Sequence, residues 1–391
     1  MATYFFRNTG STNWSLASNW SLLSGGGATG AVPTAADIAT LDLNSGSCTL
    51  TAATSVCLAL NCTGYTRVFT FNGNLQVGGS ITFSATMTIA TDLSTRSLRL
   101  STGTITSNGQ YLPITIVVVT GSTFTFADDF DCLNTAANFS GTFISNSITL
   151  RYFKIRGNFF FNGALNSLIA TPMAIRMTGT GNVTSNNFNC AIPFEIDNGA
   201  GNTTFVVATH NFSANGGYPF SFKYTTGNVT STGATIVLGS TITAFKANLN
   251  TLVLETVSLL NNVELVSALT ATNINFPANA SGIHVITGSF GFTCDYLNMN
   301  TGVGTYRTIT LNFGNTYIVN KLISTPSNPT SISGVISSSG ANRVALTLNG
   351  GSNLIRCNIT RVNASGGVII NTIGIITDCS NVGTSTQNVL I

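Results

Sequence analysis

The residues most capable of chemistry are the three aspartates of the stretch ADDFD, namely Asp128, Asp129 and Asp131. Glycoside hydrolysis needs two carboxylates that flank a sugar, about 5–10 Å apart. Carboxylates are also the usual ligands of Ca²⁺ and other hard cations. We interpret the stretch as a loop or strand edge, and a cation site or a catalytic pair remain the alternatives.

The other titratable residues stand alone in the sequence. His210 lies in ATHNFS and His284 in GIHVI, contexts typical of surface or hydrogen-bonded structural histidines. Glu195, Asp197 and Asp92 have no evident partners, and no phosphate-binding loop, zinc-ligand spacing or nucleophile elbow is present. The sequence therefore predicts no catalytic, cofactor-binding or metal site, and a protein that is not an enzyme.

The densest basic stretch is RYFKIR, residues 151–156. On a strand, Lys154 and Arg156 would share one face and Arg151 would take the other, because successive side chains alternate. The net charge of the whole chain is only +3, and no basic stripe continues from this stretch. We therefore expect a solvated strand face and no nucleic-acid partner.

Composition excludes several classes of protein. Charged residues make up only 7% of the 391 residues, but hydrophobic residues reach 43%, which is too many for a disordered chain. The longest apolar stretch, residues 114–119, is far shorter than the ~18 residues of a membrane-spanning helix. The amino terminus has no basic segment followed by an apolar one, so we expect neither a signal peptide nor membrane insertion.

The chain has eight cysteines without a repeated C-x-x-C spacing. Five of them follow an apolar residue by two positions and would share its face on a strand. We expect these to be buried, reduced and inert, since no export signal directs the chain to an oxidising compartment. The five are Cys62, Cys132, Cys190, Cys294 and Cys357.

The clearest periodicity runs through residues 69–89, FTFNGNLQVGGSITFSATMTI, where apolar or small residues occupy the odd positions. A period of two over 21 residues indicates strands, and its length requires several of them, broken at Asn72-Gly73 and Gly78-Gly79. Residues 246–269 also alternate better than they match a helix. Because this pattern recurs to the end of the chain, the sequence predicts an all-β, elongated parallel β-helix or β-solenoid, with coils of roughly 20–25 residues stacked ~4.8 Å apart.

A solenoid has two open ends that need caps. Both tryptophans of the chain, Trp14 and Trp20, lie in the less regular first sixty residues. We expect these indoles to cover the first coil, and a ligand platform is the alternative. The predicted organisation is an N-terminal cap or attachment segment (1–60), a β-solenoid shaft (61–325) and C-terminal closing coils (326–391).

Both ends of the chain resemble segments of known proteins. The spacing W-x5-W, followed by G-x-VPTAADIA and TLTAATSV, resembles the leading segment of large β-helical proteins of bacterial surfaces and of tailed-phage virions. The order LISTPSNPTSISG, RVALTLNGGSNLIRCNITRVNASGGVII and TDCSNVG resembles the ending of phage structural proteins, although their final Gly-Trp is missing here. The resemblance implies a virion structural protein of the head-fibre, tail-fibre or capsid-decoration type.

The sequence-based expectation is therefore a non-catalytic virion component, assembled in the host cytoplasm and released by lysis. The run Phe159–Phe161 must turn at least one ring outward, which favours coverage by further copies, and a homotrimer is a closed arrangement that would supply them. Other expected partners are capsid or tail proteins and a host surface glycan. An adhesin-like carbohydrate-binding solenoid and a polysaccharide depolymerase on the same scaffold are the alternatives.

Overall fold

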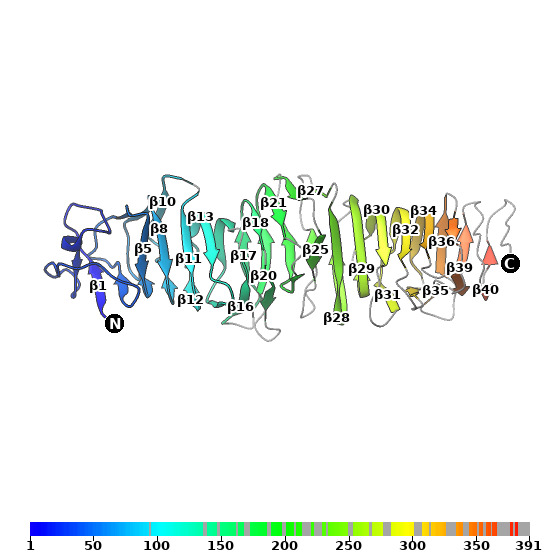
Figure 1. The fold of residues 1–391 in the computed structure, drawn as a ribbon, viewed down its shortest axis with the longest axis horizontal. Helices are drawn as coiled ribbons and strands as arrows, with labels where there is room; N and C mark the ends of the chain where they lie inside the picture. The colour runs from blue at the N-terminus through cyan, green and yellow to red at the C-terminus, as the bar shows by residue number, and fades with distance from the viewer. Residues whose placement is uncertain are drawn as a thin grey trace. The chain divides into compact units, whose positions relative to one another are not determined.

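The computed structural model confirms an all-β fold of parallel strands wound into a β-solenoid (Figure 1). The only helical element among the described residues is the single 3-10 turn η1 (Ala17–Asn19). The structure describes residues 1–93, 95–135, 139–146, 149–161, 163–167, 173–185, 189–197, 201–206, 209–212, 220–222, 229–231, 234–248, 253–265, 268–276, 283–300, 307–312, 314–325, 334–338, 344–349, 352–354, 357–360, 362–365, 376–377 and 380–381.

The chain divides into two compact units, Met1–Ile192 with Asp197–Thr203 and Pro193–Ile196 with Thr204–Ile391. This division is distinct from the cap, shaft and closing segments expected from the sequence, whose boundaries stay predictions. The strands of the first unit are β1 (Thr3–Phe6), β2 (Trp20–Ser21), β3 (Ile38–Thr40), β4 (Cys48–Leu50), β5 (Thr54–Cys57), β6 (Ala59–Asn61), β7 (Val68–Phe71), β8 (Asn74–Val77), β9 (Ile81–Thr82), β10 (Thr88–Thr91), β11 (Ser97–Leu100), β12 (Gly103–Thr106), β13 (Tyr111–Val118), β14 (Thr123–Phe126), β15 (Phe130–Thr135), β16 (Gly141–Ser145), β17 (Arg151–Ile155), β18 (Phe159–Phe160), β19 (Leu165–Ser167), β20 (Met173–Met177), β21 (Gly181–Thr184) and β22 (Asn189–Cys190).

The remaining strands belong to the second unit, except that β24 begins at the last residue of the first. They are β23 (Phe194–Ile196), β24 (Thr203–Phe205), β25 (Thr209–Phe212), β26 (Phe220–Phe222), β27 (Val229–Thr230), β28 (Thr235–Asn248), β29 (Val253–Leu265), β30 (Leu269–Phe276), β31 (Ile283–Gly288), β32 (Phe292–Asn300), β33 (Arg307–Leu311), β34 (Thr316–Thr325), β35 (Gly334–Ser338), β36 (Val344–Leu348), β37 (Ser352–Leu354), β38 (Cys357–Thr360), β39 (Val362–Ser365), β40 (Ile376–Thr377) and β41 (Ser380–Asn381).

Alternation of apolar and polar residues decides which side chains enter the core. In β13 the even-numbered residues from Leu112 to Val118 are buried, and the intervening residues are partly exposed. The breaks predicted at Asn72-Gly73 and Gly78-Gly79 are confirmed, since β7, β8 and β9 are separated at these points. Ala85 departs from the pattern and is exposed, because residues 84–87 form a turn closed by the Met87 N–H and the Ser84 carbonyl.

Apart from the antiparallel pair β1 and β2, the described strand pairs are parallel and join a strand to its counterpart one coil later. Tyr111 of β13 pairs with Asp131 of β15, Asp131 with Lys154 of β17, and Lys154 with Arg176 of β20. The offsets are 131 − 111 = 20, 154 − 131 = 23 and 176 − 154 = 22 residues. These agree with the predicted coil length.

Side-chain amides add a second set of bonds between coils of the first unit. The Asn134 Oδ1 accepts the N–H of Asn158 at 2.7 Å, and the Asn158 Oδ1 accepts the N–H of Asn182 at 2.9 Å. At two successive steps along the solenoid, the side chain of an asparagine in one coil thus accepts a hydrogen bond from a backbone N–H of the next coil.

The second unit contains much longer strands than the sequence predicts. Strand β28 has 14 residues and β29 has 13. Only β29 lies wholly within residues 246–269, which were expected to be β rather than helical, and it confirms that expectation. Strands β28 and β29 pair in parallel with a register shift between Ser240 and Phe245. Such an irregularity bends a strand without ending it, so the chain turns a corner of the coil with no loop.

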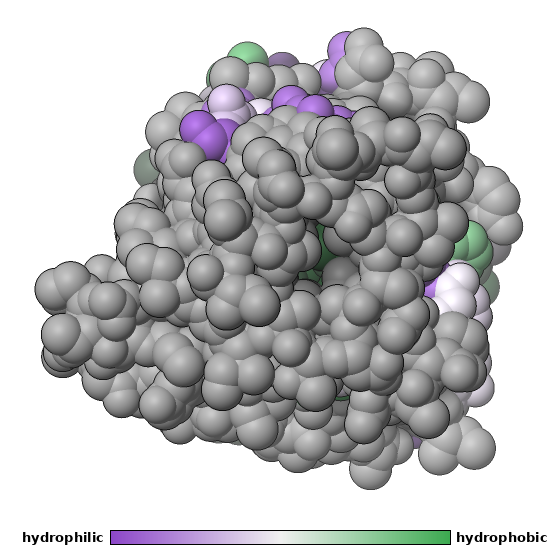
Figure 2. Space-filling model, turned by 90° about the vertical axis from the view of Figure 1, so that its right-hand side faces the viewer, coloured by the Kyte–Doolittle hydropathy of each residue, from purple (hydrophilic) through white to green (hydrophobic). Residues whose placement is uncertain are grey.

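Phenylalanine fills the interior of the first unit between β14 and β18. Phe153 lies 5.4–6.0 Å, centroid to centroid, from the rings of four other phenylalanines. In the run Phe159–Phe161 the outer two rings are fully buried and only Phe160 is directed outward, where it is half-buried. In the view of Figure 2, which faces the right-hand side of Figure 1, the few described residues that are visible include hydrophilic ones and small separate hydrophobic spots. The four partners of Phe153 are Phe126, Phe130, Phe139 and Phe143.

The two tryptophans are buried at the amino-terminal end of the first unit, at 2% and 0% exposure. The Trp20 ring meets Phe6 and Trp14 edge-on at 5.2 and 4.7 Å, and its indole N–H donates to the Trp14 carbonyl at 2.7 Å. Trp14 also lies 6.3 Å from Phe69 of β7. The prediction that the indoles cover the first coil is confirmed.

Candidate functional site

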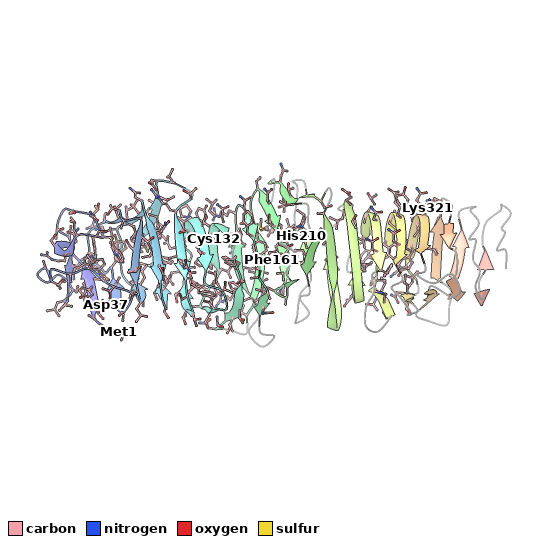
Figure 3. The ribbon with its side chains drawn as sticks, in the orientation of Figure 1. Met1, Asp37, Cys132, Phe161, His210 and Lys321 are labelled. Atoms are coloured by element: carbon pink, nitrogen blue, oxygen red, sulfur yellow. The ribbon has the colours of Figure 1, made fainter. Side chains whose placement is uncertain are left out.

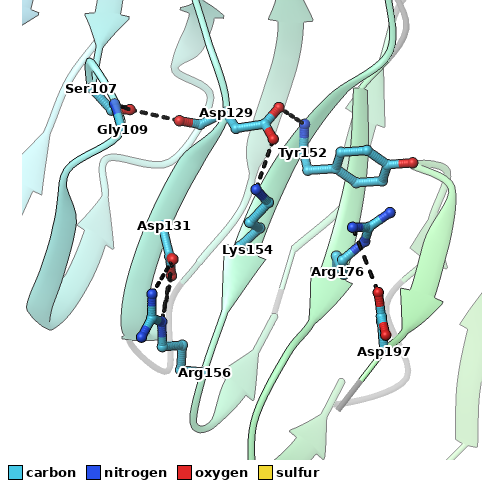
Figure 4. Close-up of polar contacts among 9 residues, drawn as sticks. All are labelled: Ser107, Gly109, Asp129, Asp131, Tyr152, Lys154, Arg156, Arg176 and Asp197. Atoms are coloured by element: carbon cyan, nitrogen blue, oxygen red, sulfur yellow. Dashed lines mark hydrogen bonds and ion pairs between the residues drawn. The ribbon is translucent and has the colours of Figure 1, made fainter. Parts of the chain in front are cut away.

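Six of the described charged residues lie close together on one outward face of the first unit, on and beside β15, β17 and β20 and next to β13 (Figure 4). Here Tyr111, Asp131, Lys154 and Arg176 occupy the same register position on four successive coils. Their neighbours along each strand, such as Leu112, are buried. Strand alternation therefore places one polar side chain per coil in a straight row, which we call the polar row.

Ion pairs link the polar row to the residues beside it. Lys154 Nζ lies 2.8 Å from Asp129 Oδ2, and Arg176 Nη1 lies 3.6 Å from Asp197 Oδ2. Arg156 donates to both oxygens of Asp131, with Nη2 to Oδ2 at 2.6 Å. Three carboxylates thus meet three cations, and the face carries no net charge.

Each guanidinium of this face also stacks on a tyrosine. Arg156 Cζ lies 3.9 Å from the centre of the Tyr111 ring, and Arg176 Cζ lies 3.6 Å from that of Tyr152. The hydrogen bonds to Asp131 raise the pKa of Arg156, which stays fully charged. Partial burial raises the pKa of Tyr111, so its hydroxyl stays protonated at neutral pH. Stacking and ion pairing together fix the side chains that reach solvent.

The prediction that ADDFD is a loop or strand edge is confirmed. Each of its three aspartates accepts hydrogen bonds from residues of a neighbouring coil. The Asp128 carboxylate accepts the N–H groups of Ser107 and Asn108, in a turn where Asn108 has a φ of +51° and Gly109 of +78°. Asp129 accepts the N–H of Tyr152 at 3.0 Å, and its carbonyl accepts the Ser107 hydroxyl at 2.6 Å. The carboxylates therefore fasten one coil to the next.

This arrangement offers little to acid–base or metal chemistry. A general acid or base needs a carboxyl group free to exchange a proton with substrate, whereas Asp129 and Asp131 face cations. In the described part of the chain, no group of three or more His, Cys, Asp or Glu side chains is placed to hold a metal ion. The chemistry that the face can perform is recognition through hydrogen bonds and ring contacts.

The sequence pointed to only half of this face. It singled out Asp129, Asp131, Lys154 and Arg156 as separate acidic and basic stretches and left Asp197 without a partner. It missed Tyr111, Tyr152 and Arg176 altogether. The signal that could have found them is an outward polar residue repeated every 20–23 residues, but the coil length varies and hides this period.

The isolated titratable residues lie elsewhere. Asp92 pairs with Arg96 four residues later, at 2.7 Å, and Glu195 is buried on β23 of the second unit. Both histidines are fully buried, so the surface interpretation is wrong for them. His210 Nε2 lies 2.8 Å from the Val206 carbonyl, and its ring meets Phe205 edge-on at 5.3 Å.

Burial of His210 predicts sensitivity to acid. Desolvation lowers the pKa of His210, so below about pH 6.5 the unfolded chain binds a proton that the folded one does not. The free energy of unfolding should therefore fall as the pH drops through this window. The variant His210→Gln, which keeps a side-chain N–H, should lose part of this slope in urea titrations from pH 8 to pH 5. An identical slope in the variant would contradict the assignment.

Six cysteines of the described part are buried and unbridged, which confirms the prediction for Cys62, Cys132, Cys190 and Cys294 (Figure 3 labels Cys132). Burial raises the pKa of Cys57, Cys190 and Cys294 to about 12 and raises that of Cys62 further still. Thiols of such high pKa are poor nucleophiles. The side chains of Cys357 and Cys379 lie outside the described residues.

Thiol titration should reveal this burial. In the folded protein, a disulfide reagent should react slowly with the cysteines, because hardly any thiolate is present at neutral pH. After denaturation without reductant, nearly all eight cysteines of the chain should react. A count of two or fewer would mean that disulfides hold the fold.

No described segment forms a helix with the length and apolar character needed to cross a membrane. In comparisons with known proteins, no family model, no curated protein and no solved structure matches the chain.

Proposed function

We propose that the protein is a non-catalytic structural component of the virion of a phage or related virus, of the head-fibre, capsid-decoration or tail-fibre type. The observation that carries the proposal is the pairing of the acidic cluster, whose carboxylates bind neighbouring coils and cations. The β-solenoid fold is compatible with this role, and the resemblance of both chain ends to phage structural proteins supports it.

The surface of the N-terminal cap supports attachment to another protein. Leu22, Leu23 and Leu43 are 55%, 71% and 70% exposed, and Leu16 is 43% exposed. Leu23 and Leu43 adjoin Ser24 and Asn44, whose side chains are hydrogen-bonded at 2.8 Å, so the loops that carry them lie together. Residues 8–36 contain no charged side chain. A surface with several exposed leucines and few charges, Arg7 and Asp42 being beside it, favours contact with protein, here a capsid or tail protein or further copies of the chain.

Activity and assembly measurements test the proposal. Purified protein incubated with bacterial capsular or cell-wall polysaccharide should release no reducing ends. Native mass spectrometry should give three times the chain mass, and antiserum against the protein should label purified virus particles. If the wild type releases reducing ends and the variant Asp128→Asn or Asp131→Asn does not, the protein is a depolymerase. If the antiserum does not label the virus particles, the protein is not a virion component.

A further inference from the structure

We propose that the outward face of β13, β15, β17 and β20 is a binding site for a linear, uncharged glycan that lies along the polar row. The site consists of Tyr111, Tyr152 and the ion-paired residues around them. The inference concerns ligand binding, goes beyond the structural role, and does not depend on the virion assignment.

The concentration of charge on this face is the first observation behind the proposal. The whole chain has 15 basic and 12 acidic residues, or 15 + 12 = 27, and six of them lie here on neighbouring coils. Exposed ion pairs contribute only about 0–1 kcal/mol each, so folding stability alone gives little reason to gather them. The six residues are Asp129, Asp131, Lys154, Arg156, Arg176 and Asp197.

The spacing of the polar row matches a ligand that repeats along a line. The residues that carry the hydroxyl, carboxylate, ammonium and guanidinium groups are stacked in register, so their Cα atoms follow one another at the strand separation of about 4.8 Å. This separation is close to the advance of one sugar ring in an extended glycan. Sugar hydroxyls both donate and accept hydrogen bonds, so they can pair with the acceptor Asp131 and with the donors Lys154 and Arg176.

The tyrosines supply the apolar part of the site. Each ring has a guanidinium stacked over one of its faces, so the planar groups available to a ligand are the outer face of the guanidinium and the uncovered parts of the ring. The C–H faces of sugar rings pack on such flat surfaces, while planar Arg and Asp groups bind pairs of hydroxyls. The side chains remain accessible, with 48% exposure for Arg156 and 29% for Lys154.

Existing contacts prepare the site for binding. The carboxylate of Asp131 holds Arg156 through both oxygens, and that of Asp129 is held by the Tyr152 N–H and by Lys154. A ligand therefore meets side chains that have already lost their rotamer freedom, which lowers the entropic cost of binding.

The charge balance and the topology exclude two other ligands. A polyanion such as nucleic acid binds through an excess of positive charge, whereas three acids here offset three bases. A peptide that adds a strand needs a free sheet edge, but β15 and β17 each have a paired strand on both sides. An uncharged glycan needs neither feature.

A printed array of linear oligosaccharides, both neutral and anionic, tests the proposal at physiological salt. The wild-type protein should bind one or more of the neutral oligosaccharides. Tyr152→Ala and Arg176→Gln should each weaken this binding about tenfold or more, while Tyr152→Phe, which keeps the ring, should retain most of it. Arg99→Gln on β11 removes an exposed charge of the same sheet away from the row and should bind as the wild type does.

Each alternative outcome is decisive. Binding of no oligosaccharide by the folded wild type overturns the proposal, as does binding of anionic oligosaccharides alone that disappears at raised salt. Equal losses in Arg99→Gln and Tyr152→Ala would place the glycan elsewhere. Circular dichroism shows whether each variant is folded. If Tyr152→Ala fails to fold, the double variant Asp129→Asn/Lys154→Gln, which should also weaken glycan binding, replaces it in the test.

Discussion

Replacement of Trp20 by alanine is expected to lower the free energy of unfolding by about 3–5 kcal/mol, the cost of removing a fully buried large aromatic side chain. The variant loses the edge-on contacts with Phe6 and Trp14 and the indole hydrogen bond to the Trp14 carbonyl. It also opens a void next to the first coil, so the loss should appear in urea unfolding followed by circular dichroism.

The exposed leucines of the same cap provide a matched control. Leu23→Ala alters a side chain that is 71% exposed and should change stability by no more than about 0.5 kcal/mol. A Trp20→Ala protein as stable as the wild type, which had instead lost a sugar or protein ligand, would revive the interpretation of the indoles as a platform.

Phe153→Ala should be similarly destabilising, by about 3–5 kcal/mol, because this ring joins phenylalanines from several coils. Aromatic pairs add about 0.5–1.5 kcal/mol beyond the area they bury, and Phe153 takes part in four. Thermal and urea unfolding of the variant measure the loss.

Phe160 offers the comparison within the same region. Its ring points outward and is only half-buried, so Phe160→Ala should cost distinctly less than Phe153→Ala. Phe153→Leu, which refills most of the space, should fall between the two. Equal losses at both positions would contradict the placement of Phe153 in the core and of Phe160 at the surface.

The fold was predictable because a period of two follows directly from strand geometry. Phe69, Phe71, Leu75 and Val77 could be assigned to the core from the sequence, and all four are fully buried. The long strand β28 was not predictable in this way. Its corner is a register shift within continuous β structure, and Gly239, which stands just before the shift, would have suggested a break between two strands rather than one long strand.

The candidate site was predictable only in part, because it is assembled across coils. Asp131 and Arg156 are 25 residues apart in sequence, and Arg176 and Asp197 are 21 apart, yet each pair is in contact. Coil length varies through turns and a register irregularity between Leu112 and Thr115, so the sequence does not state which residues become neighbours. The buried histidines were missed because a lone His carries no periodic signal.

Glycines in the first unit mark where one coil rests directly on another. A Cβ atom on Gly103 would come within 2.5 Å of the Gly79 backbone, and one on Gly181 within 2.0 Å of the Gly157 carbonyl oxygen. In both cases a glycine of one coil lies against a glycine of the preceding coil. Insertion of one residue within a coil would shift the register, and a residue with a larger side chain would then lie against the backbone of the neighbouring coil. During evolution, the chain can therefore gain or lose whole coils, or residues in exposed turns. Insertions of single residues inside the stacked strands should be removed by selection.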